Sequence, residues 1–186
     1  MPVIRDHQET TGPANERYRA DKGFILTICH LMDREIINFI QQQHIATVCC
    51  SDDQGNPFCF SCMYAFNEQE GLLYFKSEAS AQHCLLLARR PTVAGTILPD
   101  KINMLAIKGL QFSGRVILTK ETLPLQPGKE YHKKYPFALV MPGEVFTISF
   151  ISIKMTDKSR GISRKVVWHR ETADISGHNQ LKDTQN

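Results

Sequence analysis

Four of the six cysteines lie between residues 49 and 62, in the run CCSDDQGNPFCFSC. Cysteines this close together could form a redox pair or bind zinc. The run is predicted to form a hairpin that turns at residues 52–57, and side chains three apart on one strand, such as Cys59 and Cys62, point to opposite faces. Cys49 and Cys50 diverge for the same reason. We therefore predict that these thiols pack as small buried hydrophobes and form neither a redox nor a metal site.

A second run, residues 77–83 (SEASAQH), has residue types that can bind a phosphate group. A strand is predicted to end and a helix to begin here, so free backbone N–H groups and the positive end of the helix dipole face outward. Ser77 and Ser80 add hydroxyl groups, and His83 adds a ring whose protonated form a phosphate dianion would favour. The alternative is structural, with Ser80 capping the helix and His83 lying on the surface.

The elements that must position these runs are mostly strands. A helix capped by Asp33 is predicted to end near Gln43, and two further helices are expected at residues 81–89 and 124–135. Alternating or β-branched runs predict strands at residues 45–51, 58–66, 72–76, 92–98, 103–119, 145–155 and 165–169. Gly109 and Gly114 predict bulges or bends in the long fifth strand, where the sheet closes on itself. Six or seven mostly antiparallel strands with short helices predict a mainly β protein built as a small barrel.

Composition narrows the classes of function. The chain has 186 residues, 42% hydrophobic and 22% charged, as expected of one globular domain. Its net charge is only +3 and its cations are scattered, which argues against a nucleic-acid partner. The apolar stretch at residues 24–32 is too short to span a bilayer and lacks a small-residue cleavage site. We predict a cytoplasmic protein with no membrane partner and with reduced cysteines.

A helix, a strand, a turn and a strand are predicted in this order, followed by the runs GLLYFKSEASAQHCLLLARRPTVAGTI and IKGLQFSGRV. In this ordered set the chain resembles the FMN-binding split barrel of pyridoxamine 5′-phosphate oxidase-like proteins. The later run EVFTISFISIKMTDKSRGISRKVVWHR is most similar to the uncharacterised YhbP-like branch of that superfamily. The resemblance covers residues 33–170. It implies a split-barrel domain between a partly disordered N-terminal extension, residues 1–32, and a polar tail, residues 171–186.

The resemblance implies a homodimer with two FMN sites at the subunit interface and a small-molecule substrate. His83 stands where the oxidase has a phosphate-binding lysine and Gln82 where it has an arginine, so two cationic contacts are missing. Lys165 and Trp168 lie on the last strand, which in the family approaches the flavin from the partner subunit; a Trp packed at the barrel end is the alternative. The implied cofactor-binding residues are Phe60, Ser61, Cys62, Phe75, Lys76, Ser77, Ser80, Gln82, His83, Lys165 and Trp168.

Two functions remain open at this stage. The first is a flavin-dependent oxidoreductase that acts on an unknown small substrate; the flavin carries the redox chemistry in such enzymes, and we identify no catalytic acid or base. The second is a non-enzymatic module on the same barrel that binds or senses flavin or heme.

Overall fold

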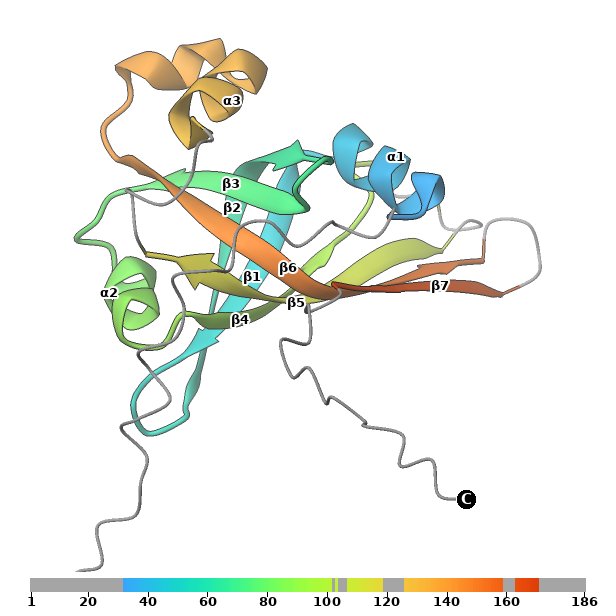
Figure 1. Cartoon of the computed structure of the whole chain (residues 1–186). Helices are drawn as coiled ribbons and strands as arrows, with labels where there is room; N and C mark the ends of the chain where they lie inside the picture. Colours follow the sequence, from blue (N-terminus) through green and yellow to red (C-terminus); the bar gives the residue numbers. More distant parts are fainter. Residues whose placement is uncertain (1–31, 102, 104–106, 119–125, 159–162, 171–186) are drawn as a thin grey trace, which may run out of the picture.

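The computed structural model describes residues 32–101, 103, 107–118, 126–158 and 163–170 (Figure 1). The predicted tail, residues 171–186, lies outside the described residues, and so does the predicted N-terminal extension up to residue 31. Met32 is described, and it is buried in the main core with the barrel residues. The folded domain therefore includes at least one residue that the sequence assigned to the extension.

Helix α1 (Arg34–Gln42) begins at the predicted cap. The Asp33 Oδ1 atom accepts a hydrogen bond from the Glu35 backbone N–H at 2.7 Å, which satisfies one of the free donors of the first turn. The apolar face of the helix packs against the same core as the strands; its buried residues are Ile36, Ile37, Phe39 and Ile40. The helix ends one residue before the predicted Gln43.

The described residues form seven strands in one antiparallel sheet, ordered β3-β2-β1-β4-β5-β6-β7. The strands are β1 (Ile45–Ser51), β2 (Pro57–Asn67), β3 (Leu72–Ser77), β4 (Thr92–Ile97), β5 (Lys108–Ile117), β6 (Glu144–Asp157) and β7 (Arg164–His169). Strand β3 also pairs with β6, so six strands close into a barrel and β7 extends the sheet along the far part of β6. The predicted mainly β barrel is confirmed.

Three short helical segments complete the described fold. Helix α2 (Gln82–Arg89) connects β3 to β4, and α3 (Pro127–Lys134) continues into a 3-10 helix, η2 (Pro136–Val140), before β6 begins. Figure 1 shows α3 above β3 and β6, and α2 below the end of β3. The two helices therefore lie on different sides of the strand end that carries the predicted phosphate-binding run.

Strand β2 separates two hydrophobic clusters. Its predicted alternating residues, from Phe58 to Phe66, face the barrel interior and pack with the main core. Ala65 points to the opposite face and is also buried, because α3 and η2 cover that face with Tyr131, Tyr135 and Ala138. Aromatic side chains thus fill the barrel on one side of β2 and attach the helical cover on the other.

The glycines of β5 differ in their roles. The pairing of β5 with β6 shifts between Ser113 and Gly114, which confirms the predicted bulge at Gly114. Gly109 pairs regularly with Thr156, so the predicted bulge or bend is not a bulge at this position. A Cβ atom at Gly109 would lie 3.1 Å from the Leu98 side chain, which indicates close packing as the reason for glycine. Strand β5 is also shorter than predicted, since it begins at Lys108.

Candidate functional site

Four of the predicted cofactor-binding residues meet where β3 ends and α2 begins; we call Phe60, Phe75, Ser77 and His83 the strand-end cluster. The His83 and Phe60 rings stack with centroids 4.0 Å apart and planes 16° apart. The His83 Nε2 and Ser77 Oγ atoms are hydrogen bonded at 2.8 Å. The centroid of the Phe75 ring lies 5.6 Å from that of Phe60 and 6.5 Å from that of His83. A hydroxyl group and an imidazole are therefore held against an aromatic wall.

The first turn of α2 adds backbone donors beside this cluster. Ala81 is the N-cap residue, and no side chain among the described residues caps the helix. The structural alternative for Ser80, a helix cap, is therefore wrong. Ser80 and Gln82 are both exposed at this turn. The positive end of α2 and its unbonded N–H groups are left for solvent or for an anion.

The cluster carries little positive charge. Burial lowers the pKa of His83, because desolvation disfavours the imidazolium form. This shift opposes the one that a phosphate dianion would produce. Cys84, which the sequence analysis did not place at this site, is buried beside the cluster, and its burial raises the thiol pKa while a hydrogen bond with Ser77 opposes that rise.

Lys76 precedes Ser77 in the chain but serves a different part of the molecule. Its Nζ atom donates to the Ala138 carbonyl at 2.6 Å and to the Met141 carbonyl at 2.8 Å. The same ammonium lies 3.5 Å from His132 Nε2. Because neighbouring residues on a strand face opposite sides, Lys76 binds the end of η2 on the outer face while Ser77 faces the cluster.

Ser61 and Cys62 are likewise separated by the alternation of β2. Ser61 is exposed on the outer face, where its Oγ atom lies 3.3 Å from Thr47 Oγ1. Cys62 faces inward, and burial raises its thiol pKa to about 12. The family resemblance implied that both residues bind the cofactor, and in a single chain only Cys62 shares the face of the strand-end cluster.

Strand β7 positions Lys165 and Trp168 far from Ser77 within one chain. Ser77 pairs with Glu144 at the start of β6, whereas Trp168 pairs with Ile153, nine residues further along that strand. This separation corresponds to roughly 30 Å of strand. Trp168 is only 6% exposed and belongs to the core of its own chain, which favours the packing role that the sequence left open. Lys165 is exposed.

Gly143 supports the strand-end cluster and was not predicted from the sequence. It has a φ of 110°, and a Cβ atom there would lie 2.7 Å from the Ser77 carbonyl oxygen. Only glycine adopts this conformation readily and leaves room for the backbone of β3. The Pro-Gly pair at residues 142–143 is a turn signal that could have indicated a tight bend before β6.

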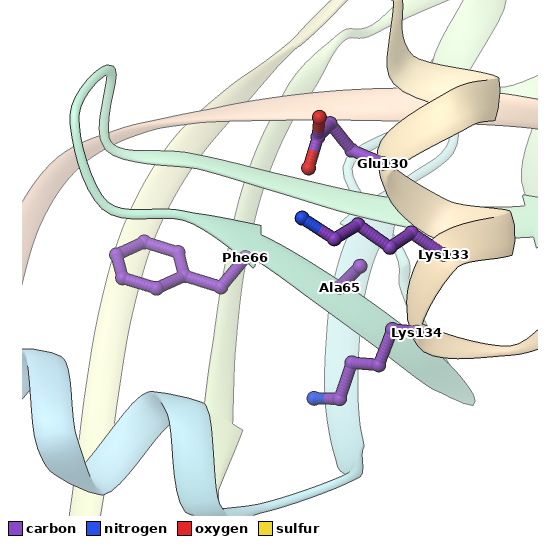
Figure 2. A pocket seen from close by; sticks show the side chains of 5 residues that line it. All are labelled: Ala65, Phe66, Glu130, Lys133 and Lys134. Carbon is purple, nitrogen blue, oxygen red and sulfur yellow. The ribbon is translucent and has the colours of Figure 1, made fainter.

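A second feature is a cavity of about 310 Å³ between α3 and β2. Figure 2 shows Glu130, Lys133 and Lys134 extending from α3 toward Ala65 and Phe66. The volume is near the lower limit of small-molecule sites. The ammonium groups of Lys133 and Lys134 could bind a small organic anion, and the carboxylate of Glu130 opposes that charge.

Lys134, at the edge of this cavity, is held by aromatic and backbone groups. Its Nζ atom lies 4.9 Å from the Tyr64 ring centroid and 5.5 Å from that of Tyr135. It also donates to the Gln43 carbonyl at 3.1 Å. Burial lowers the Lys134 pKa, and the charge of Asp100 opposes that shift. Tyr135 follows Lys134 in the chain, whereas Tyr64 and Gln43 come from distant segments, so no local pattern in the sequence indicates this arrangement.

Two further properties of the described residues bear on function. No group of three or more His, Cys, Asp or Glu side chains in this part of the chain is arranged to hold a metal ion. None of the described helices is long and apolar enough to cross a membrane.

The closed six-stranded barrel with its appended strand has the fold of the pyridoxamine 5′-phosphate oxidase-like split-barrel proteins. A pyridoxamine 5′-phosphate oxidase-related, FMN binding protein from Nostoc punctiforme superposes with a TM-score of 0.54 at 10% identity, covering 74% of this chain and 89% of that one. A heme binding protein from Mycobacterium smegmatis gives 0.57 at 13% identity, covering 69% and 54%. HutZ, the heme storage protein from Vibrio cholerae, gives 0.51 at 16% identity, covering 73% and 92%. Identities this low show the fold alone.

Sequence comparison identifies the family within this class. A UPF0306 protein from Yersinia enterocolitica is 30% identical over 135 residues, which span 73% of this chain and 91% of that protein. A UPF0306 protein from Yersinia pestis matches with the same identity and coverage. The chain belongs to the UPF0306 family, which confirms the predicted YhbP-like branch. No protein-family model matches the sequence.

Proposed function

We propose that this chain binds FMN, with the phosphate at the junction of β3 and α2, and acts as a flavin-dependent oxidoreductase on a small substrate. The observation that carries the proposal is the hydrogen-bonded pair of Ser77 and His83 beside the uncapped first turn of α2. Hydroxyl, imidazole and backbone N–H donors that converge at a helix N-terminus suit a phosphate group. The FMN-binding protein from Nostoc punctiforme with the same fold adds support.

The residues present fit such a phosphate through hydrogen bonds more than through charge. Ser77 and the first-turn N–H groups of α2 would donate to its oxygens, and His83 would donate once protonated. Lys76, the nearest cation in the sequence, is bonded to carbonyls on the other face. We therefore expect weaker FMN binding than a site with a lysine and an arginine would give. A bound flavin would supply the redox chemistry, and this chain would supply orientation and electrostatics.

The same proposal includes a homodimer in the cytoplasm. Among the described strands β7 pairs only with β6, so its outer edge is open to another chain. Two apolar side chains, Ile151 and Val167, are 47% and 56% exposed on these strands. Lys165 lies too far along the sheet to reach the strand-end cluster of its own chain, so any flavin contact would come from the partner. Light scattering that shows only monomer at micromolar protein would contradict the shared site.

The phosphate contact is tested with His83→Ala and two ligands. A charge-assisted hydrogen bond contributes about 1.5–3 kcal/mol, or about 10- to 150-fold in affinity. We expect FMN to bind more weakly by about that factor while riboflavin, which has no phosphate, changes little. In the native protein FMN retention should decline as pH rises through the His83 pKa of the complex, and His83→Lys should remove that dependence. Equal losses of FMN and riboflavin in His83→Ala would contradict the assignment.

A non-enzymatic flavin- or heme-binding module is the second candidate. The composition of the strand-end cluster favours it, because His83 is the only one of its four residues that could act as an acid or a base. Two solved structures of this fold are described as a heme binding protein and a heme storage protein. The absorption spectrum of the purified protein separates flavin from heme. Bleaching of a bound flavin by NADH or NADPH would then support the oxidoreductase, and a flavin that stays oxidised would support the module.

A further inference from the structure

Two cysteines face each other across the hairpin of β1 and β2. The register of this pairing places Cys49 directly opposite Cys59. Along one strand, alternation separates neighbouring cysteines. Across the hairpin, alternation instead places opposite residues on the same face.

The hydrogen-bond pattern identifies the type of this pair. The Asp52 N–H donates to the Asn56 carbonyl at one end of the hairpin, and the Tyr64 N–H donates to the His44 carbonyl at the other. Hydrogen-bonded and non-hydrogen-bonded pairs alternate along an antiparallel ladder. Even-numbered residues of β1 therefore form hydrogen-bonded pairs with β2, and odd-numbered residues of β1 form non-hydrogen-bonded pairs. Cys49 and Cys59 therefore form a non-hydrogen-bonded pair.

This geometry suits a disulfide. Cα atoms of a non-hydrogen-bonded pair are about 4.5 Å apart, with their side chains close together. Disulfides form between Cα atoms about 4.4–6.8 Å apart. Pro57, opposite Ser51 in the same ladder, agrees with the assignment, because a residue at such a position donates no N–H to its partner strand.

The thiols of this pair lie on the outer surface. Cys59 is exposed and Cys49 is half-buried, so the prediction that these thiols are buried is wrong for Cys59. A side-chain hydrogen bond with Cys59 raises the pKa of Cys49 to about 11, so Cys49 keeps its proton at neutral pH. Cys50 and Cys62 lie on the inner face with the barrel core and do not compete for a small reagent at the outer surface.

We propose that Cys49 and Cys59 are a dithiol site that exchanges with low-molecular-weight disulfides. The Cys59 thiolate attacks one sulfur of the small disulfide, which forms a mixed disulfide and releases one small thiol. Cys49 then loses its proton and attacks the Cys59 sulfur, releasing the second small thiol and closing the cross-strand bond. The protein is oxidised by two electrons and the small disulfide is reduced to two thiols. The site is on the outer face and does not depend on the proposed flavin.

The experiment equilibrates the full chain with glutathione disulfide, blocks free thiols and measures intact mass. All variants carry Cys29→Ser, because Cys29 lies outside the described residues. The oxidised sample should carry two fewer blocking groups than the reduced sample and should lack the two thiol hydrogens, and dithiothreitol added before blocking should reverse both changes. A protease that cuts before Asp52 and Asp53 separates Cys49 from Cys59, so the two peptides should remain joined only in the oxidised sample.

Single variants assign the roles of the two thiols. Cys49→Ser should stop at the mixed disulfide and retain one glutathione, whereas Cys59→Ser should acquire neither glutathione nor a bridge. Cys62→Ser is the matched control from the same strand and should oxidise as the parent does. The proposal is overturned if both thiols stay free at equilibrium, or if Cys62→Ser abolishes the bridge. A mixed disulfide that persists in the parent chain would also overturn it, since Cys49 would then be unable to resolve the intermediate.

Discussion

The end of β3 separates two groups of polar side chains that differ in what they bind. On the inner side Ser77 and His83 bond to each other beside the first turn of α2. On the outer side Lys76 bonds to the carbonyls of Ala138 and Met141. The side with free backbone donors thus lacks a lysine, and the side with the lysine has carbonyl acceptors that use its donors.

This comparison teaches that a cation adjacent to a site in sequence need not belong to the site. Successive residues of a strand face opposite sides, so Lys76 and Ser77 are separated by the sheet although they are covalently linked. Each group therefore predicts a different phenotype. Changes on the outer side should affect stability with little effect on ligand binding, and changes on the inner side should do the reverse.

The largest effect is expected for Lys76→Met. It leaves the carbonyls of Ala138 and Met141 without their ammonium donor, so the free energy of unfolding should fall by about 3 kcal/mol. FMN affinity should change by less than about twofold, because the ammonium is not part of the strand-end cluster. Urea unfolding and flavin titration measure the two quantities. Lys129→Met, an exposed lysine on α3, is the control and should leave both unchanged. A large loss of FMN affinity in still-folded Lys76→Met would erase the distinction between the two sides.

Gly143→Ala should have the next largest effect and should affect both sides. The positive φ and the contact with the Ser77 carbonyl make alanine strained, at a cost of about 2 kcal/mol. Because the strain acts on the backbone of Ser77, FMN should also bind more weakly. Gly128→Ala on α3 is the matched control, since nothing lies within 4 Å of its added Cβ, and it should be neutral or slightly stabilising. Equal stability of the two variants in urea would contradict this role for Gly143.

The smallest expected effect is a pH dependence of stability from His83. Its pKa is lowered by burial, so the unfolded chain binds a proton more readily than the folded one. The stability that this group provides is present above its ordinary pKa of 6.5 and is lost as pH falls through the lower pKa of the folded state. In urea unfolding without ligand, His83→Gln should therefore lose less stability than the native protein between neutral and acidic pH. Parallel curves would show that burial of His83 has no such consequence.

Local periodicity predicted most of the fold. The alternation of residues 58–66 and the change from strand to helix at residues 77–83 both follow from the spacing of apolar side chains. The sequence did not predict the pairing of β3 with β6, because that contact depends on the curvature of the whole sheet and not on any local pattern. For the same reason it did not predict that η2 would bind Lys76.

The candidate site was predictable where its residues are neighbours in the chain. Ser77 and His83 belong to one turn and were found together, whereas Gly143 reaches Ser77 only after the barrel closes. The pair of Cys49 and Cys59 is an intermediate case. Counting outward from the turn between Asp52 and Asn56 would have placed the two cysteines opposite each other, so this information was present in the sequence.

The closure of the barrel has a consequence for the order of folding. The pairings of β1 with β2 and of β2 with β3 are local hairpins, whereas the pairing of β3 with β6 joins Ser77 to Glu144 across the intervening chain. Non-local strand pairs form slowly, because the entropy of closing a long loop must be overcome first. Ser77 belongs to that closing seam, so its surroundings are completed only after β6 has paired with β3. A nascent chain whose β6 segment is still inside the ribosome already contains every residue of the strand-end cluster. It still has no binding site, because β3 has not yet paired with β6.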